Sequence, residues 1–465
     1  MRLLLVNPNR AREPFPVPPL GLAWVAAAAR RAGHAVRLLD LAFGEWRPKL
    51  DRALAEFEPE AVGLGVRNVD NALFQHYQSY LPHLREVAAA LRDPARPLIL
   101  GGPGFSIFPA ELLEALGADY GLVGEGEEAL PLLLGRLEAG RDASDVPGLV
   151  WRGNGRPDSN PARPPRSLDQ LPQPEHYLID YARYEAAAGY AAIQTKRGYP
   201  CRCIYCSYPQ LEGGWFRLRP PEAVGEELST LVRCGVRHVF FTDSVFNLPQ
   251  AYAEVVCAEI LRRRLPLRWM AYCNPRGLTL ELARLMRRSG CLGVELGIDS
   301  ASDAMLERLG KGFTQADIVA ASQALRQAGI PQALYCLVGG PGEDLSTIRD
   351  SLGAIGRHTR PQFVAVNVGL RVLPGTPLAG LVGTPEADGP WLVPRFYLSP
   401  GVDAAALAEL ERLCRANCRC ASPSELRHPF TRALIGLMVR ARVRPFWRHA
   451  WLNGWQRRLF FWVGP

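Results

Sequence analysis

The sequence predicts an α/β protein with two successive parallel sheets and a helical C-terminal tail. Short apolar runs alternate with helical patterns over residues 1–150 and again over 185–400, which is typical of βαβ units. Between them, residues 154–174 hold six prolines in 21 positions and few apolar side chains, which indicates an exposed connector. We therefore expect a first domain at 1–150, a proline-rich linker at 151–184, a second domain at 185–400 and a helical region at 401–465.

The composition is that of a globular protein with two or three domains. The 465 residues are 48% apolar and 22% charged, which excludes a disordered or collagen-like chain. No apolar run reaches the ~18 residues of a membrane span, and the chain opens on the strand-like MRLLLV without a signal-peptide pattern. Eleven cysteines in such a chain predict reduced, cytoplasmic thiols that can serve as metal ligands, and they exclude a secreted disulfide scaffold.

The positive charge belongs to the tail. The formal +8 is 54 Lys and Arg against 46 Asp and Glu, and residues 426–465 contain eight arginines and no acid. The first 425 residues are therefore formally neutral, so we expect no nucleic-acid-binding body.

In the first domain, five strand patterns alternate with five helical ones. We expect strands at 3–6, 35–41, 61–66, 97–102 and 120–123, and helices near 20–32, 48–57, 76–92, 109–117 and 126–139. Ligands of such sheets bind at the carboxyl ends of the strands. The segments after the first, third and fourth strands are NPNR, VRNVDN and GGPGFS, so the predicted ligand edge is polar and glycine-rich.

The second alternation has six strand patterns, which predict a partial (β/α)6 barrel or a large open sheet. We expect strands near 190–195, 238–242, 268–272, 292–298, 333–338 and 363–369, and helices near 221–233, 249–264, 278–289, 314–328 and 344–357.

Three cysteines follow the first strand of this domain, in Gly198-Tyr-Pro-Cys201-Arg-Cys203-Ile-Tyr-Cys206. Structural cysteines are scattered through apolar stretches, whereas three thiols within six residues of one loop predict a zinc or iron–sulfur site. Zinc alone would usually need a fourth ligand nearby, and the local sequence offers none.

The loop from Thr195 to Pro209 resembles the cluster loop of radical S-adenosylmethionine (SAM) enzymes. Motifs at later strand ends extend the likeness, namely FFTDSVFN at 240–247, VELGIDS at 294–300 followed by Lys311, and LVGGPGE at 337–343.

Residues 1–150 resemble the cobalamin-binding domain that precedes this core in one large subclass. The likeness rests on Asn7-Pro8, PVPPLG at 16–21, Gly101-Gly102 before Phe105, and GEGEE at 124–128. Together the two resemblances cover roughly residues 1–400 and imply a Rossmann-like cobalamin-binding domain followed by a radical SAM barrel.

The resemblance implies a [4Fe–4S] cluster held by three cysteines, SAM on its fourth iron, and an external one-electron reductant. Reduction of the SAM sulfonium would release methionine and a 5′-deoxyadenosyl radical. We expect Glu295 to lie near SAM as an acceptor for its ammonium or ribose, as the proposed catalytic carboxylate. The other expected SAM-site residues are Tyr205, Asp243, Ser300, Gly339 and Gly340.

The cysteine spacing departs from the family's C-x3-C-x2-C pattern. Tyr199 stands at the first family position, and Cys201, Cys203 and Cys206 give C-x-C-x2-C. We expect Cys201 to bind iron through an altered loop at Pro200. If only Cys203 and Cys206 remained as ligands, the cluster would be weak or absent.

The cobalamin domain lacks the family's D-x-H-x-x-G motif, whose histidine binds cobalt from below, so we expect no histidine ligand there. We expect Arg67, Asn68 and Asn71 beneath the corrin, and Gly101, Gly102 and Ser106 beside the nucleotide tail. The alternative is a flavodoxin-like fold that binds no cofactor.

The C-terminal region carries two further patterns. Cys414, Cys418 and Cys420 are expected to pack locally, with an auxiliary iron–sulfur site or a fourth ligand as alternatives. Residues 426–465 join the arginines to four tryptophans, of which Trp447, Trp451 and Trp455 share a helical face. They predict a helical cap on the barrel or, alternatively, contact with a membrane surface.

We therefore expect a cobalamin-dependent radical SAM enzyme that methylates an unactivated carbon of a small-molecule or lipid-like substrate. Cyclisation or rearrangement is the first alternative, and a non-catalytic cofactor-binding relative, prompted by Tyr199, is the second. A zinc-stabilised binding module is the third.

Overall fold

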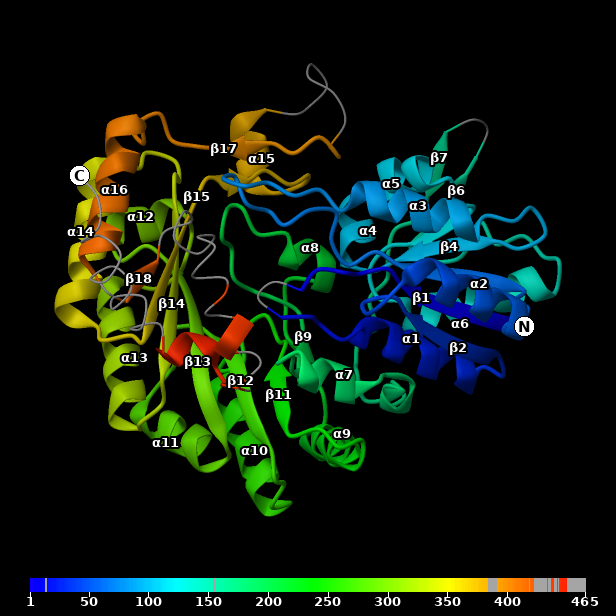
Figure 1. Cartoon of the computed structure of the whole chain (residues 1–465), viewed down its shortest axis with the longest axis horizontal. Helices are drawn as coiled ribbons and strands as arrows, with labels where there is room; N and C mark the ends of the chain where they lie inside the picture. The colour runs from blue at the N-terminus through cyan, green and yellow to red at the C-terminus, as the bar shows by residue number, and fades with distance from the viewer. Residues whose placement is uncertain are drawn as a thin grey trace.

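The computed structural model describes residues 1–465 except 13–14, 154–155, 384–390, 418, 422–432, 434–435, 439–440, 442 and 450–465. Figure 1 shows two α/β domains side by side, the N-terminal one in blue and cyan and the second in green to orange. Within the described part of the chain, no helix is long and apolar enough to cross a membrane.

The N-terminal domain is built on a seven-stranded sheet in the order β2-β1-β3-β4-β5-β6-β7. The five predicted strands are confirmed and lie parallel: β1 (Arg2–Asn7), β2 (Ala35–Asp40), β3 (Ala61–Gly65), β4 (Leu98–Gly101) and β5 (Tyr120–Leu122). Two antiparallel strands, β6 (Leu149–Arg152) and β7 (Pro157–Ser159), were not expected. The edge strand β7 opens with a proline of the predicted linker, which an edge position accommodates because that residue donates no ladder hydrogen bond.

Helices cover both faces of this sheet. On one face, α1 (Leu20–Arg31) and α6 (Gly126–Glu138) pack on alternate strand residues such as Leu3 and Leu5. The other face carries α2 (Trp46–Phe57), α3 (Leu81–Leu91) and α5 (Pro109–Leu116), and Leu4 and Val6 point into that layer. A sheet buried on both faces explains why its strands are continuous apolar runs.

The second domain is an open barrel of seven parallel strands in the order β18-β15-β14-β13-β12-β11-β8. Six of them match the predicted strands: β8 (Ala191–Ile193), β11 (His238–Phe241), β12 (Arg268–Cys273), β13 (Cys291–Asp299), β14 (Gln332–Val338) and β15 (Phe363–Val368). The seventh, β18 (Cys420–Ala421), comes from the C-terminal region and was not expected.

The predicted barrel helices are present as α9 (Pro221–Arg233), α10 (Gln250–Arg262), α11 (Leu280–Arg288), α13 (Gln315–Gln327) and α14 (Leu345–His358), and α16 (Ala404–Ala416) follows them. Side-chain caps fix where two of them begin. Thr314 and Asp317 form a capping box at α13, and Asp344 and Thr347 form one at α14, so donors of the first turns are satisfied within the chain.

The barrel sheet has two apolar faces. Alternate residues such as Val294 and Leu296 of β13 pack outward against the helices. The inner face holds a second cluster that includes Phe240, Met270 and, from the C-terminal region, Trp447.

Smaller elements surround the barrel opening. Strand β9 (Lys196–Arg197) pairs antiparallel with β10 (Arg217–Leu218), and the cysteines and α8 (Tyr208–Glu212) lie between them. The remaining elements are α4 (Pro103–Ile107), α7 (Tyr181–Ala186), α12 (Asp303–Arg308), α15 (Pro377–Val382), β16 (Leu370–Arg371), β17 (Phe396–Tyr397), and the 3-10 turns η1 (His176–Leu178) and η3 (Phe446–His449).

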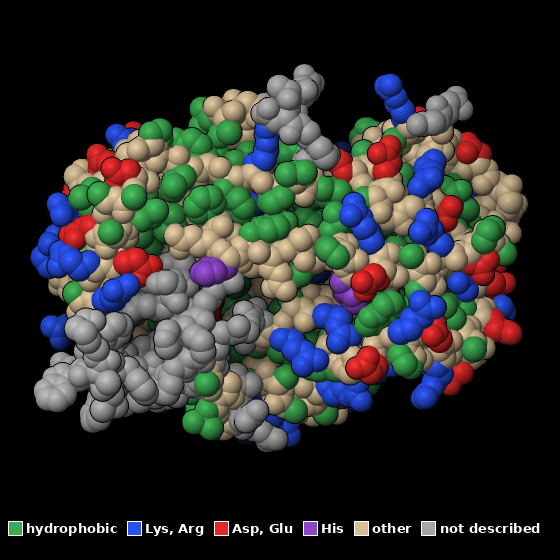
Figure 2. Space-filling view, turned by 45° about the horizontal axis from the view of Figure 1, so that its top comes forward, with side chains coloured by type: hydrophobic (Ala, Val, Ile, Leu, Met, Phe, Trp, Pro, Cys, Tyr) green, Lys and Arg blue, Asp and Glu red, His purple; other side chains and the backbone are tan. Residues whose placement is uncertain are grey.

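Figure 2 shows one face of the molecule, on which acidic and basic side chains are interspersed over the N-terminal domain, at the right, instead of being separated by sign. Hydrophobic side chains form a band across the upper part of the same face.

Candidate cluster and cofactor site

The cysteine loop leaves β9 through a glycine that no other residue could replace without rearrangement. Gly198 has φ 100°, and a Cβ there would lie 1.7 Å from the Trp215 carbonyl oxygen. The next residue, Tyr199, donates its backbone N–H to the Gly213 carbonyl at 2.9 Å. The start of the loop therefore packs closely against residues 213–215, which lead into β10.

The phenol of Tyr199 lies near the thiols of the loop. Its hydroxyl lies 4.0 Å from the Cys203 sulfur, and burial together with the nearby Cys203, Cys201 and Cys206 raises the pKa of Tyr199. Cys203 is 4% exposed, and burial raises the pKa of Cys206 to about 12. Tyr199 is therefore a close neighbour of the predicted ligands.

The thiols of Cys201, Cys203 and Cys206 are donors of the kind that an iron–sulfur cluster uses, and they bind as thiolates. Among the described residues, no group of three His, Cys, Asp or Glu converges as ligands of one metal ion. The fit to a cluster therefore rests on the chemistry of the three donors in one loop.

A buried trio supports the loop from below. Asp299, at the end of β13, has φ 60° and accepts a hydrogen bond from Lys311 Nζ at 2.7 Å and another from the Tyr205 hydroxyl. Lys311 also reaches the Tyr205 hydroxyl at 3.4 Å. Non-glycine residues with positive φ are costly, and such strain gathers at functional sites. Tyr205 therefore supports the cysteine loop through Asp299.

A cavity of about 110 Å³ opens beside Cys203. Its wall contains Tyr199, Ser244, Tyr272, Asn274, Gly297, Lys311 and Phe313 among others. A Cβ built on Gly297 would meet nothing within 4 Å, so the β13 backbone is open there to a ligand. Polar and aromatic walls of this kind bind small organic groups.

Asp243, which was predicted to belong to the SAM site, is 1% exposed, and both its oxygens are engaged within the chain. They accept hydrogen bonds from the Thr195 backbone N–H at 2.7 Å, the Thr195 hydroxyl at 2.5 Å and Lys196 Nζ at 3.1 Å. Asp243 therefore fixes the chain that leads into the cysteine loop. Ser300 is buried and its hydroxyl accepts from the Ser302 backbone N–H at 3.1 Å.

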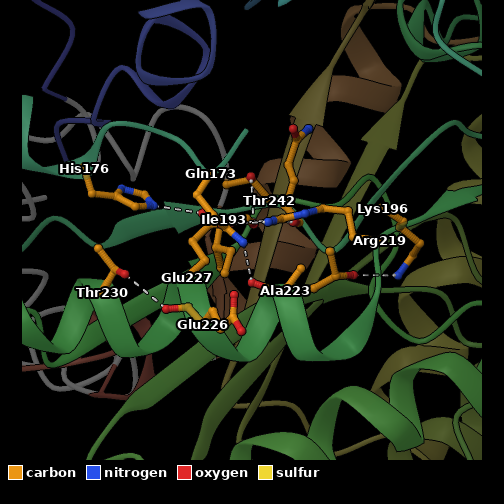
Figure 3. A network of polar contacts seen from close by, with 12 residues as sticks. Gln173, His176, Ile193, Lys196, Arg219, Ala223, Glu226, Glu227, Thr230 and Thr242 are labelled. Carbon is orange, nitrogen blue, oxygen red and sulfur yellow. Dashed lines mark hydrogen bonds and ion pairs between the residues drawn. The ribbon is translucent and has the colours of Figure 1, made fainter. Parts of the chain in front are cut away.

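Figure 3 shows the polar network beside this chain, which ties the connector to the barrel. Glu227 of α9 pairs with Arg219 at 2.5 Å and with His176 at 2.9 Å. Burial alone would raise the pKa of Glu227, but Arg219 and His176 lower it. Gln173 donates to the Ala223 carbonyl at 2.9 Å, so residues of the predicted linker are held on α9.

The glycine motif after β14 is folded onto itself. The backbone N–H groups of Gly339 and Gly340 donate to the Glu343 carboxylate at 2.6 and 3.0 Å. Burial raises the pKa of Glu343 to about 7. A Cβ on Gly340 would lie 2.9 Å from a Leu309 methyl, so this glycine allows close packing of α12 on the turn.

Glu295 lies inside the barrel, in the middle of β13. It is 5% exposed, and Oε1 accepts a hydrogen bond from Trp447 Nε1 at 3.0 Å. Burial raises the pKa of Glu295 to about 7, although hydrogen bonds from Trp447 and Tyr335 lower it in part. Tyr272 is close enough for Glu295 to raise its pKa and is 46% exposed at the cavity.

The predicted cobalamin edge faces the barrel opening. Arg67, after β3, is exposed and lowers the pKa values of Tyr208 and Tyr272 across the domain boundary, against the larger effect of their burial. Asn68 is half-buried beside it, whereas Asn71 closes its own loop by donating to the His76 carbonyl at 3.1 Å.

Gly101, the last residue of β4, and Gly102 after it differ in the space that they leave. A Cβ on Gly101 would meet nothing within 4 Å, whereas at Gly102, with φ 97°, it would lie 2.7 Å from the Val66 carbonyl. The Ser106 hydroxyl accepts from the Gly124 backbone N–H at 2.9 Å. Open backbone at a helix-flanked strand end fits a cofactor tail.

Buried ion pairs fix the two domains together. Arg197 of β9 pairs with Glu125 at 2.7 Å and with Glu127 at 2.5 Å, and Arg217 of β10 pairs with Glu125. These side chains are 1–8% exposed. The hairpin that carries the cysteines is thereby attached to the first turn of α6.

A second link joins the loop after β3 to the barrel. Asp70 pairs with Arg371 at 3.2 Å, and the side chains are 7% and 6% exposed. Sequence reasoning missed both links, since the charges involved lie 70 or more residues apart.

The second cysteine group packs inside the protein. Cys414 and Cys420 are buried with their sulfurs 3.1 Å apart, while Cys418 lies outside the described residues. Of the tail tryptophans, only Trp447 is described, and it packs on the barrel as the helical-cap interpretation expected. Trp451 and Trp455 lie outside the described residues.

Family comparisons match both halves of the chain. A model described as "Radical SAM superfamily" matches residues 200–355, and one described as "B12 binding domain" matches residues 8–134. These are the two domains that the cysteine loop and the glycine-rich edge predicted.

Curated proteins and solved structures point the same way. The chain is 29% identical to a tryptophan 2-C-methyltransferase of Streptomyces laurentii over 441 residues, which cover 81% of this chain and 73% of that protein. It is 28% identical to a hopanoid C-3 methylase of Methylococcus capsulatus over 330 residues, covering 68% and 60%. The solved structure of the radical SAM methyltransferase TsrM from Kitasatospora setae, with cobalamin and a [4Fe–4S] cluster bound, is similar at a TM-score of 0.85 and 26% identity over 98% of both chains.

Proposed function

We propose that this protein, which belongs to the cobalamin-dependent radical SAM methyltransferases, methylates a carbon atom of a small, largely aromatic substrate held at the barrel opening. The observation that carries the proposal is that the barrel opening and the ligand edge of the cobalamin domain face each other. Tyr272 of the barrel lines the cavity beside Cys203, and the exposed Arg67 of the cobalamin domain is near enough to Tyr272 to lower its pKa in part.

The cofactors of the family supply the difficult chemistry when bound: the cluster and SAM carry electron and methyl chemistry, and cobalamin carries methyl transfer. The chain's own contribution is to hold and orient them. Cys201, Cys203 and Cys206 would bind the cluster, and Asp299, Lys311 and Tyr205 would support their loop.

Further roles follow from the geometry. Arg67 and Asn68 would lie beneath the corrin and Gly101 beside its tail, while Gly297 leaves the β13 backbone open at the cavity wall. Gly339, Gly340, Asp243 and Ser300 would act by shaping the surrounding turns, because their polar groups are satisfied within the chain.

The cavity wall supports an aromatic substrate. Tyr199, Tyr272 and Phe313 line the space beside Cys203, and aromatic rings bind one another with a preference beyond area burial. The Streptomyces laurentii relative is named for tryptophan, so L-tryptophan is the first substrate to test.

The test begins with metal content. We expect about four irons per chain after anaerobic reconstitution, with cobalt after addition of hydroxocobalamin. Cys201→Ala should lose most of the iron, whereas Cys234→Ala, which removes a thiol outside the loop, should keep it. The double variant Tyr199→Cys/Cys201→Ala should recover iron by restoring the family spacing.

Activity is then measured with SAM, a one-electron reductant and L-tryptophan, by mass spectrometry of the products. A substrate gain of one methyl group supports the proposal, and a loss of hydrogen without that gain indicates cyclisation. A wild-type chain that binds no cluster would contradict the enzyme assignment and leave a cofactor-binding relative.

A further inference from the structure

A tryptophan from the C-terminal region fills the interior of the barrel. Trp447 of η3 is 1% exposed and lies in one cluster with Phe240, Met270 and Phe363 of the inner face. Gly293 of β13 makes room for it, since a Cβ there would lie 2.7 Å from Trp447 Cη2. Figure 1 shows η3, in red, against the barrel strands.

The preceding turn anchors this segment at the N-terminal ends of the strands, opposite the cysteine loop. Arg444 pairs with Glu185 at 2.6 Å and donates to the Gly189 carbonyl at 3.1 Å. Its guanidinium also lies 5.5 Å from the ring centre of Tyr190, directly before β8. The C-terminal segment therefore enters the barrel from below and closes it.

The indole of Trp447 makes a contact that packing alone does not require. Another buried tryptophan, Trp269, donates its N–H to a backbone carbonyl, that of Ser289, at 3.0 Å. Trp447 instead donates to the Glu295 carboxylate at 3.0 Å. Burying a carboxyl group is costly, and a backbone carbonyl can satisfy a buried indole N–H, as it does for Trp269. The carboxyl group of Glu295 is therefore not needed to satisfy Trp447, which indicates a functional role for Glu295.

The surroundings of Glu295 leave it without a cation. The titratable groups that face it are the phenols of Tyr272 on β12, Tyr335 on β14 and Tyr190 before β8. No ion pair of Glu295 is present among the described residues. Tyr272 is near both sites, because it lines the cavity beside Cys203 and is close enough to Glu295 for that carboxyl group to raise its pKa.

We propose that Trp447 is a positioning residue: its indole N–H, together with the Tyr335 hydroxyl, orients the Glu295 carboxylate so that it accepts a further hydrogen bond from an N–H or O–H of the substrate. This inference rests on the proposed function and narrows it. The substrate would carry an amine, ring N–H or hydroxyl that reaches down past Tyr272 into the barrel.

The first test needs neither substrate nor cofactor. Infrared spectra of the full chain labelled with [¹³C]glutamate are recorded between pH 5 and pH 9, and the band missing in Glu295→Gln identifies the carboxyl group. In Trp447→Phe the midpoint of that band should rise by about one pH unit, a tenfold gain in proton affinity, because a donor to the ionised form is lost.

Matched variants separate positioning from general damage. Trp151→Phe, on β6 of the other domain, should titrate like wild type. Gly293→Ala keeps the indole of Trp447 but displaces it, so the midpoint of the Glu295 band should also rise in this variant. If Trp447→Phe does not fold, Gly293→Ala alone tests the positioning role. A midpoint in both barrel variants equal to that of wild type would overturn the proposal.

The second test uses L-tryptophan and SAM on the reconstituted enzyme. Trp447→Phe should keep wild-type iron and cobalt contents, while the pH at which its kcat/KM is half-maximal moves upward by about the same one unit. Unchanged pH dependence would count against the positioning role. If wild type does not methylate tryptophan, the substrate proposal fails, while the infrared result still decides the role of Trp447.

Discussion

The ion pairs between the two domains allow a quantitative test of how the cysteine loop is held. Arg197 and Arg217 are balanced by Glu125 and Glu127, with contacts of 2.7 Å and 2.5 Å at Arg197. The substitution Glu125→Gln removes a charge that faces both arginines and leaves one buried positive charge uncompensated.

Two estimates give the same size for the effect. A unit charge pair at ~4 Å contributes about 4 kcal/mol at the effective dielectric constant of a protein interior near its surface. Removing one partner of a buried pair costs about 3–5 kcal/mol in proteins. The arginine side chains here are 8% and 1% exposed, so solvent screening is weak and the full range applies.

The assay is hydrogen exchange measured by mass spectrometry, which reports local opening free energies. Glu125→Gln should lower the opening free energy of α6 and of residues 195–218 by about 3–5 kcal/mol. Glu128→Gln, an exposed position on the same turn of α6, is the matched control and should change it by less than about 0.5 kcal/mol. Equal exchange in the two variants would refute the reasoning.

Three further outcomes are expected. Gly198→Ala should abolish cluster binding, measured as iron per chain, because its Cβ would lie 1.7 Å from the Trp215 carbonyl oxygen; normal iron would show that the loop has another conformation. Gly101→Ala should leave the melting temperature unchanged, since its Cβ meets nothing within 4 Å, yet weaken cobalamin binding in a spectral titration. Unchanged binding would show that the nucleotide tail does not lie beside Gly101. The pKa of Glu295 is raised to about 7 in the folded chain, from an ordinary value of 4.5. Between these two pH values the folded chain keeps a proton on Glu295 that the unfolded chain has released. Its contribution to stability is therefore present below about pH 4.5 and lost as the pH rises through 7, so wild type should lose about 3 kcal/mol relative to Glu295→Gln between pH 4 and pH 8 in urea unfolding; a constant difference would contradict the burial of Glu295.

The sequence was informative where function depends on local pattern. The strand and helix periods gave eleven strands of the two sheets and the order of the domains, and three thiols in one loop predicted the cluster chemistry that the family comparison supports. These features are local, because hydrophobic periodicity and ligand spacing both depend on residues that are close together in the sequence.

What the sequence could not give are the contacts between distant residues. Glu295 was predicted as the carboxylate near SAM, but its hydrogen bond from Trp447, 152 residues away in the chain, could not be predicted. Strand β18 has two residues and no periodicity to detect. The proline-rich stretch hid β7, since an edge strand tolerates a residue that ordinarily argues against one.

The indole inside the barrel makes the barrel interior dependent on the C-terminal region of the chain. Trp447 donates to Glu295 and Arg444 pairs with Glu185, so two contacts of the barrel come from residues that follow its last strand, β18. A chain that stops before Arg444 would contain every strand of both sheets and would lack both contacts. We expect Glu295 in such a chain to be more hydrated and to ionise at a lower pH.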